Sequence, residues 1–137
     1  MGCPVIWCSK LQPCIATSTM ESEYTALSMS LRAAIPLMAV TEAINKGLEF
    51  VHHRLLTFKA TVHEDNMGAL RLSQLEPGRN TPRSKFYTLK LHWFRSWLKP
   101  KCIEIIHCPT QQQKADFLSK SLSPMAFKAC RKLSMGW

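Results

Sequence analysis

The sequence predicts an α/β fold formed by a single domain. Residues 57–64 alternate apolar and polar side chains, end at Glu64-Asp65, and precede a predicted helix from Met67 to Leu75. A second β-prone stretch, Cys102 to Cys108, is the strongest strand candidate in the chain. Other segments carry apolar residues three and four apart, which predicts helices packed on these strands. A strand that ends in an acid and leads into a helix is where an α/β sheet places its chemistry.

The first part of the chain is predicted to be extended and then helical. Pro4 to Ser9 and Cys14 to Thr19 are short β-prone stretches, separated by a turn. A helix is expected from Ser18 or Thr19 to Ala34, and Pro36 is expected to break or kink it. A continuation over 37–45 should end at Lys46-Gly47. The residues predicted to face the core are Met20, Tyr24, Leu27 and Leu31.

The second part of the chain contains one clear loop and three predicted helices. Residues 76–83 are rich in turn formers, and Ser84 is predicted to cap a helix that runs to Leu98. The aromatic residues of this helix are spaced as core residues are, with Lys85, Lys90, Arg95 and Lys99 on its other side. After the 102–108 strand, a helix is expected from Gln111 or Gln112 through Leu118. A basic helix should then cover 125–133.

Composition favours an intracellular protein without a membrane segment. No apolar stretch approaches the roughly 18 residues of a membrane helix, and residues 1–11 lack a basic start followed by a long apolar stretch. The six cysteines include no Cys-x-x-Cys pair, which favours reduced, buried thiols over a zinc site or disulfides.

The positive charge lies entirely in the second half of the chain. Up to Asp65 there are five Lys or Arg against six Asp or Glu, and from Asn66 onward there are thirteen against three. Such asymmetry is typical of a protein that binds a polyanion, because cations on the protein replace counterions on phosphates. An ordinary solvated surface is the alternative.

Two acids near the start of the first helix are predicted to have different roles. Ser18 and Glu21 have the spacing of a capping box, which gives Glu21 a structural role. Glu23 lies about 60° from the centre of the apolar face, at about 100° per residue, and Glu21 lies on the other side. A carboxylate at the border of a buried face requires a cation or a hydrogen-bond network.

Five motifs in this order resemble the ribonuclease H region at the end of copia-type retrotransposon polyproteins. The motifs are Ser9-Lys10-Leu11-Gln12 with Ser18-Thr19-Met20-Glu21-Ser22-Glu23-Tyr24, His63-Glu64-Asp65-Asn66-Met67-Gly68-Ala69, Arg83-Ser84-Lys85, Pro109-Thr110, and Lys114-Ala115-Asp116-Phe117-Leu118-Ser119-Lys120. The resemblance covers almost the whole chain. It implies a ribonuclease H-like mixed sheet flanked by helices, with residues 1–137 as a single partial domain lacking the first two strands.

The resemblance also implies an activity and its residues. The family cleaves the RNA strand of an RNA–DNA hybrid by two-metal catalysis, with Mg²⁺ or Mn²⁺ held by carboxylates. The catalytic and metal-binding acids would be Glu23, Asp65 and Asp116. The residues expected to meet nucleic-acid phosphates are Arg79, Arg83, Lys85, Lys90, Lys114 and Lys120.

Each acid has an alternative role in the helix that carries it. Glu23 could be a helix-surface acid, Asp65 an N-cap, and Asp116 a first-turn acid favoured by the helix dipole. His107 is expected to be a strand residue, and Asn66 a capping neighbour.

The family's first aspartate has no counterpart here, because no acid precedes Glu21. We therefore expect feeble nuclease activity from this chain alone. The resemblance also implies that the strands over Val5 to Ser9 and Phe58 to Glu64 would lack a common neighbour, the missing first strand. The expected partners are an RNA–DNA hybrid and an upstream reverse transcriptase segment, and the expected location is a cytoplasmic particle or the nucleus. A non-catalytic nucleic-acid-binding module and a structural remnant of a transposable element remain open.

Overall fold

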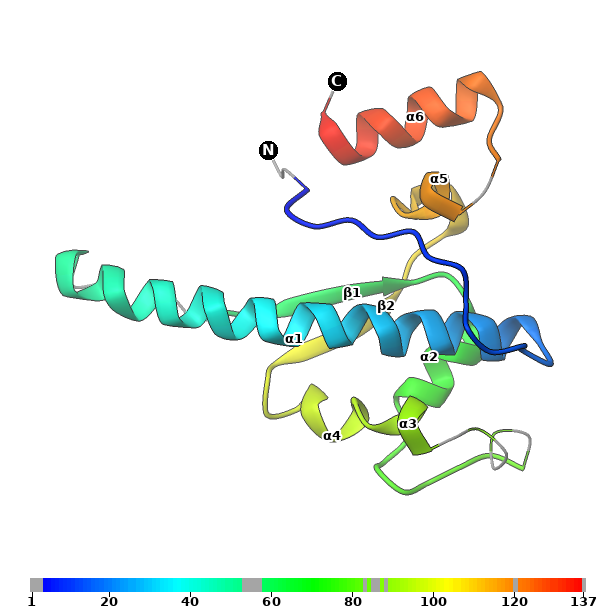
Figure 1. The fold of residues 1–137 in the computed structure, drawn as a ribbon, viewed down its shortest axis with the longest axis horizontal. Helices are drawn as coiled ribbons and strands as arrows, with labels where there is room; N and C mark the ends of the chain where they lie inside the picture. The colour runs from blue at the N-terminus through cyan, green and yellow to red at the C-terminus, as the bar shows by residue number, and fades with distance from the viewer. Residues whose placement is uncertain are drawn as a thin grey trace.

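The computed structural model describes residues 4–52, 58–82, 84, 87, 89–119 and 121–136 (Figure 1). Two parallel strands, β1 (Ala60–Glu64) and β2 (Ile103–His107), form its sheet, and Ala60 pairs with Ile103 while Glu64 pairs with His107. The long helix α1 (Thr19–His52) crosses the sheet. In Figure 1 the remaining helices lie on either side of α1. They are α2 (Met67–Ser73), α3 (Leu89–His92) and α4 (Arg95–Leu98), and, beyond the 3₁₀ turn η2 (Thr110–Gln112), α5 (Asp116–Ser119) and α6 (Pro124–Met135).

The core forms where α1, α2 and the aromatic segment meet the two strands. Tyr24, Leu27 and Leu31 of α1 are buried, as their spacing of three and four residues predicts. Their buried partners are Ala69, Leu70, Leu72, Phe94, Ile103 and Ile105. The predicted core face of the first helix is therefore confirmed, and it fixes the first turns of α1 against the sheet.

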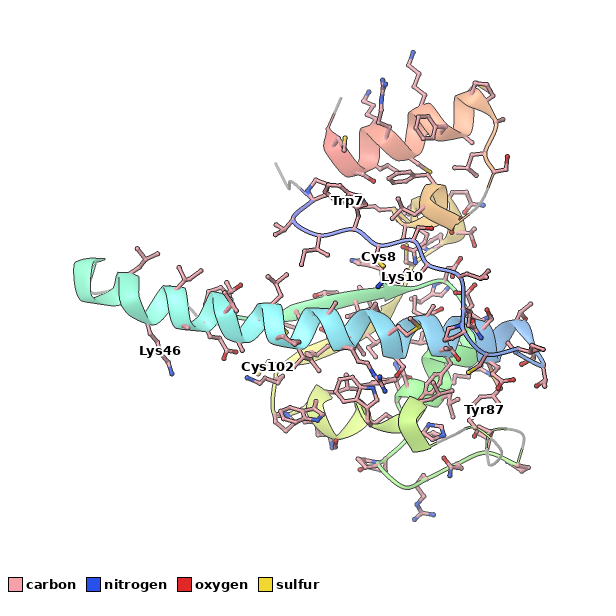
Figure 2. All side chains as sticks on the ribbon, in the orientation of Figure 1. Trp7, Cys8, Lys10, Lys46, Tyr87 and Cys102 are labelled. Carbon is pink, nitrogen blue, oxygen red and sulfur yellow. The ribbon has the colours of Figure 1, made fainter. Side chains whose placement is uncertain are left out.

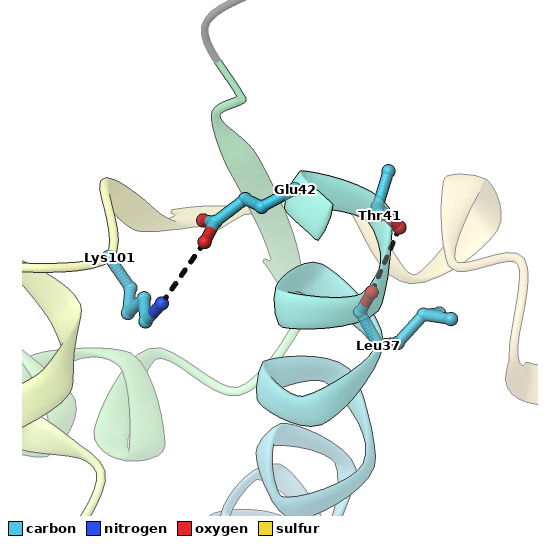
Figure 3. A network of polar contacts seen from close by, with 4 residues as sticks. All are labelled: Leu37, Thr41, Glu42 and Lys101. Carbon is cyan, nitrogen blue, oxygen red and sulfur yellow. Dashed lines mark hydrogen bonds and ion pairs between the residues drawn. The ribbon is translucent and has the colours of Figure 1, made fainter. Parts of the chain in front are cut away.

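Of the break or kink predicted at Pro36, the break is wrong, and the predicted stop at Gly47 is also wrong. Helix α1 continues through both residues as far as His52. Proline removes one backbone hydrogen bond inside a helix, but Ile35 and Met38 on either side of it pack against the core. An ion pair between Lys101 Nζ and Glu42 Oε2, at 3.3 Å, also ties this stretch to the segment before β2 (Figure 3). Tertiary contacts outweigh the local signal.

The segment before α1 forms no strand, contrary to the prediction for Pro4 to Ser9 and Cys14 to Thr19. Val5 and Trp7 are 72% and 71% exposed, and the segment runs as an extended chain past α5 (Figure 2). The Ser9 hydroxyl donates to the carbonyl of Leu118 at 2.7 Å and holds the segment there. A β-prone sequence forms a strand only where a neighbouring strand accepts its ladder of hydrogen bonds.

The predicted aromatic helix from Ser84 to Leu98 is divided. Ser84 lies in a 3₁₀ turn and Tyr87 in a bend, so the α-helix does not start at Ser84 as predicted. The described α-helical parts are α3 and α4, separated by a turn at Trp93 and Phe94. Phe94 is fully buried, which agrees with the prediction that the aromatic residues serve the core, whereas Trp97 is 44% exposed. Arg95, predicted on the solvent side, is only 4% exposed. The turn that buries Phe94 also carries Arg95 inward.

The other predicted elements agree with the structure to within a few residues. Strands β1 and β2 lie inside the predicted 57–64 and 102–108 ranges, and α2 and α6 lie where helices were expected. The predicted 111–118 helix is instead η2 followed by the short α5. Thr57 lies outside the described residues.

Two expectations from composition also need correction. Within α1, Thr19–Leu48 has an 18-residue stretch of mean hydropathy 1.3, so it is long and apolar enough to cross a membrane by length and composition. Its alanines raise the hydropathy without forming a continuous run of large apolar residues, and its first turns pack in the core. The five described cysteines are free, as expected, but Cys8, Cys14 and Cys102 are exposed, contrary to the expectation of buried thiols.

Candidate metal site

The carboxyl end of β1 brings an acid into the interior. Side chains alternate along β1, so Glu64 points to the same side as Ala60 and Val62 and is only 5% exposed. Asp65 follows directly and is half-buried. Because the backbone N–H of Cys108 donates to the carbonyl of Glu64 at 3.0 Å, the ends of β1 and β2 lie side by side here.

The start of α1 supplies a third carboxylate to this place. Glu23 lies one turn into the helix, next to buried Tyr24, and is half-buried. Ligand oxygens of Glu23, Glu64 and Asp65 all lie within 4.8 Å of one another. The structure therefore brings together two acids that the sequence predicts, Glu23 and Asp65, and adds Glu64.

Glu21 has a structural role at the helix start, as its spacing predicts, but its carboxylate binds Thr17 and not the N-cap residue Ser18. The N–H of Glu21 donates to the hydroxyl of Ser18 at 3.2 Å, which is one half of a capping box. Its carboxylate accepts hydrogen bonds from the N–H and the hydroxyl of Thr17, at 2.8 and 2.7 Å. The Glu21 carboxylate is thus held at the helix start and is not part of the Glu23 cluster.

Asn66, which was expected to be a capping neighbour, is itself the N-cap of α2, and Asp65 is not. The Asn66 side chain accepts hydrogen bonds from the N–H groups of Gly68 and Ala69 at 2.9 and 3.1 Å. Asn66 in turn donates its own N–H to Glu64 Oε1 at 3.0 Å. With the cap position occupied by Asn66, the alternative role for Asp65 is removed.

Crowding of like charges changes the proton affinity of the buried acid. The pKa of Glu64 is raised to about 7: burial raises it most, the hydrogen bond from Asn66 opposes this, and the neighbouring charges of Glu23 and Asp65 also raise it. The Glu64 carboxyl group therefore keeps its proton to a higher pH than an exposed glutamate does. A cation between the three carboxylates would displace that proton and offset their repulsion.

Asp116 lies near this end of the sheet but is not part of the three-carboxylate cluster. The side-chain N–H of Gln113 donates to the carbonyl of His63 at 3.1 Å, so the segment that leads to Asp116 passes the end of β1. Burial raises the pKa of the Cys108 thiol, and the charges of Asp65 and Asp116 raise it further. Asp116 also occupies the first turn of α5, which is the alternative position considered for it.

The predicted phosphate-binding residues are described only in part. Arg79 and Lys114 are exposed, the former in the loop after α2 and the latter before α5. Lys90 belongs to α3, but its side chain is outside the described atoms. Arg83, Lys85 and Lys120 lie outside the described residues. His107, expected to be an ordinary strand residue, is exposed at the end of β2.

The ligand chemistry of the cluster suits a divalent cation that prefers oxygen. Mg²⁺ binds oxygen at about 2.1 Å, so ligands on its opposite sides lie roughly 4.2 Å apart. Oxygens within 4.8 Å of one another can reach such an ion with small side-chain rotations. The raised pKa of the buried Glu64 carboxyl group, caused by burial and by its two acidic neighbours, also favours a bound cation.

Sequence reasoning missed Glu64 as a member of the site. Its signal was present: with a period of two, Glu64 falls on the same face of β1 as Ala60 and Val62. An acid on the buried face of a strand is a stronger sign of a functional site than an acid that only follows the strand, because the free-energy cost of burying its charge has to be compensated.

Three plant transposon polyproteins are similar to the chain. The "Retrovirus-related Pol polyprotein from transposon TNT 1-94" of Nicotiana tabacum is 26% identical over 132 residues, which cover 96% of this chain and 9% of that protein. The polyproteins from transposons RE2 and RE1 of Arabidopsis thaliana are 27% and 26% identical over 126 and 125 residues, which cover 91% of this chain and 8% of each protein. These similarities support an origin in a retrotransposon Pol polyprotein.

The chain spans less than a tenth of the length of these polyproteins. No family model matches it, and no solved structure matches it. The polyprotein origin is therefore the level of function that the comparisons support, and the chemistry of the carboxylate cluster has to be argued from its geometry.

Proposed function

We propose that the chain is a ribonuclease H-like segment of a retrotransposon polyprotein that holds a divalent cation at Glu23, Glu64 and Asp65 and binds an RNA–DNA hybrid. The observation that carries this proposal is the convergence of three carboxylates from α1 and β1, far apart in sequence, within 4.8 Å. Glu23 and Asp65 are also the acids to which the resemblance assigns catalytic roles. Two independent lines of reasoning thus lead to the same end of the sheet.

In this proposal each acid has a distinct role. Asp65 and Glu23, both half-buried, present oxygens that remain accessible to a cation and to a phosphate. Glu64 lies deeper, and its hydrogen bond from Asn66 fixes one oxygen. The bound cations would supply charge neutralisation for the attacking and leaving oxygens of a phosphodiester.

The basic half of the chain would hold the nucleic acid. Arg79 and Lys114 are exposed, and the chain from Asn66 onward carries a surplus of ten positive charges. Phosphate contacts of this type give binding that weakens steeply with salt. They position a strand without selecting its sequence.

The test uses the 137-residue chain, a hybrid with a labelled RNA strand, and calorimetric titration with Mg²⁺. We expect Mg²⁺ binding that is at least tenfold weaker in Asp65→Asn and unchanged in Glu104→Gln, an exposed acid of β2 paired with Lys59. Hybrid binding should weaken as salt rises. Cleavage should be feeble, because the family's first aspartate has no counterpart in these residues.

Several outcomes would contradict the proposal. Equal Mg²⁺ affinity in Asp65→Asn and the unsubstituted chain would exclude Asp65 as a metal ligand. Absence of hybrid binding at low salt would exclude the proposed role in nucleic-acid binding. Robust hybrid cleavage that EDTA stops and Asp65→Asn abolishes would show that the chain is an active nuclease by itself, against our expectation of weak activity.

A second candidate is a non-catalytic nucleic-acid-binding module. The observation in its favour is that Asp116 is not in the described three-carboxylate cluster, whereas the basic surplus of the second half is intact. Salt-dependent hybrid binding that Asp65→Asn leaves unchanged, together with no detectable cleavage, would favour this candidate.

A further inference from the structure

Helix α1 carries a second line of apolar side chains, on a face that the core does not use. Its members are spaced by three and four residues and are from 36% to 58% exposed: Leu37, Val40, Ile44 and Leu48. At about 100° per residue they lie within roughly 80° of one another, and their centre is roughly 130° from the buried face of Tyr24, Leu27 and Leu31. We call this set the outer line. A helix that packs only on a sheet has polar residues on its other side, so the outer line indicates a second partner.

The outer line is continuous with an apolar groove beside the N-terminal segment. Val5, Ile6 and Trp7 are between 59% and 72% exposed, and together with Ala33 and Leu37 of α1 they line a groove of about 630 Å³. In Figure 2 the segment, with Trp7 labelled, runs past α1, and in Figure 1 the carboxyl-terminal part of α1 projects beyond the other helices. Only 17% of the most apolar 18-residue stretch of α1 is buried. Most of this apolar surface is therefore not covered by the described residues.

The apolar area of this surface is close to what a stable dimer buries. With about 150–200 Å² for each fully exposed large side chain, the outer line and the three residues of the N-terminal segment expose roughly 700 Å². An interface of standard size buries about 800 Å² on each partner. The charged residues between Ala33 and Leu48 are Glu42 and Lys46, and both lie roughly 160° around the helix from the outer line. The centre of a protein–protein interface is depleted of charge in the same way.

We propose that a second copy of this chain covers the outer line and the groove, with the two α1 helices packed antiparallel about a two-fold axis. A two-fold interface uses the same patch on both chains, so the patch has to be complementary to itself. An axis that passes beside Val40 satisfies this condition, because it places Leu37 of each copy opposite Ile44 of the other. It also places Leu48 of each copy opposite the small Ala33, which lines the groove. The end of one α1 then fills the groove of the other chain.

A lipid surface is the other candidate occupant of an exposed apolar helix face. Helices that lie in a membrane interface carry many Lys and Arg beside their apolar face. From Leu37 to Leu48, α1 has one basic residue, Lys46, and one acidic residue, Glu42, which pairs with Lys101 at 3.3 Å. The charge of this stretch therefore favours a protein partner over an anionic lipid surface.

The test is sedimentation velocity of the 137-residue chain in reducing buffer with EDTA and without nucleic acid. The reductant keeps the exposed Cys8, Cys14 and Cys102 from cross-linking two chains. Over about 0.1–100 µM we expect a monomer–dimer equilibrium, because interfaces of this size have dissociation constants in the micromolar range or below. Higher salt should not weaken the dimer, since screening reduces the repulsion between two chains of net charge +9. Hybrid binding, in contrast, should weaken as salt rises.

A charge at the centre of the outer line tests whether this face forms the interface. Val40→Lys should weaken dimerisation at least tenfold, and because Val40 is 55% exposed the fold should tolerate the lysine. Ala39→Lys adds the same charge at an exposed position on another side of α1 and should leave the dimer unchanged. Circular dichroism checks that both variants keep the helix content of the unsubstituted chain.

A second pair of variants tests the antiparallel register. Leu37→Lys and Ile44→Glu should each dimerise at least tenfold more weakly than the unsubstituted chain. An equimolar mixture of the two should associate at least threefold more tightly than either variant alone, because the new lysine of one chain then faces the new glutamate of the other.

A monomer at every concentration, equal dimerisation of Val40→Lys and Ala39→Lys, or a mixture that associates no more tightly than its components would overturn the proposal. A monomer that binds phosphatidylcholine vesicles, with binding lost in Val40→Lys, would also overturn it and would assign this face to lipid. None of these measurements involves hybrid cleavage or Mg²⁺ binding, because the outer line and the groove share no residue with the carboxylate cluster.

Discussion

Replacing Glu64 by glutamine should stabilise the protein at neutral and alkaline pH in the absence of divalent cations. Glu64 is 5% exposed and lies beside Glu23 and Asp65, and its pKa is raised from 4.5 to about 7. Below pH 4.5 the carboxyl is protonated in both folded and unfolded chains, so it costs nothing. Between pH 4.5 and 7 only the unfolded chain ionises, and the free energy of unfolding falls as pH rises.

The size of this effect follows from the difference between the two pKa values. A difference of about 2.5 corresponds to at most about 3 kcal/mol of lost stability once both states are ionised, above pH 7. Glutamine keeps an oxygen that can accept the N–H of Asn66, but it carries no charge. The free energy of unfolding of Glu64→Gln should therefore exceed that of the unsubstituted protein by up to about 3 kcal/mol at pH 8, and the two should be equal near pH 4.5.

The assay is urea unfolding of both proteins in EDTA at half-unit steps from pH 4.5 to 8. The difference between the two free energies of unfolding reports Glu64 together with its coupling to Glu23 and Asp65, because groups away from these acids titrate alike in both proteins. Glu104→Gln, at an exposed acid of β2, is the matched control and should show no such trend. A difference between unsubstituted protein and Glu64→Gln that stays constant over this range would refute the reasoning.

Divalent cations should reduce the stability difference between the two proteins at pH 8. A cation whose dissociation constant for the folded chain is one tenth of its concentration adds about 1.4 kcal/mol to the free energy of unfolding. We expect Mg²⁺ to stabilise the unsubstituted protein by about this amount and to stabilise Glu64→Gln much less. Equal stabilisation of both proteins by Mg²⁺ would exclude Glu64 as a ligand.

Three further predictions follow from the same contacts. Asp65→Asn should weaken Mg²⁺ affinity at least tenfold in calorimetric titration, whereas Asp116→Asn, outside the cluster, should change it less than threefold. Equal losses of affinity would contradict the assignment of Asp65, and not Asp116, as a ligand. Asn66→Ala should lower the free energy of unfolding by about 1 kcal/mol because α2 loses its cap, and Asn66→Ser should restore most of it; urea unfolding measures both. Leu31→Ala should cost roughly 3 kcal/mol because Leu31 is 1% exposed, whereas Leu37→Ala, at a 36% exposed position of the same helix, should cost under about 1.5 kcal/mol in the same assay.

Local sequence signals predicted the parts of this fold whose causes are local. The capping serine and the apolar spacing at the start of α1 depend on residues within two turns, and both appear in the structure. The alternation over 57–64 predicted β1 in the same way. Each of these features depends on residues close in sequence, so a single sequence contains enough information to predict it.

The wrong predictions concern features that depend on distant residues. Pro36 would end an isolated helix, but Ile35 and Met38 are held by residues of other elements. Val5 to Trp7 is β-prone, but a strand also requires a partner, which the described residues do not supply. Burial of Arg95 likewise depends on the loop at Arg79 and Asn80. In each case, the presence or the absence of a contact with a remote segment decided the outcome.

The candidate site combines both kinds of feature, which explains why it was predicted only in part. Glu23 and Asp65 are marked by local position, at a helix border and at a strand end. Their proximity requires that α1 cross the carboxyl end of β1, and the contact between Met20 of α1 and Gly68 of α2 allows that crossing. A Cβ at Gly68 would lie 2.8 Å from Met20 Sδ, so glycine permits the close approach of the two helices. The cluster therefore depends on a residue with no charge, and moving α1 away from α2 would separate Glu23 from Glu64 and Asp65 without altering any of the three acids.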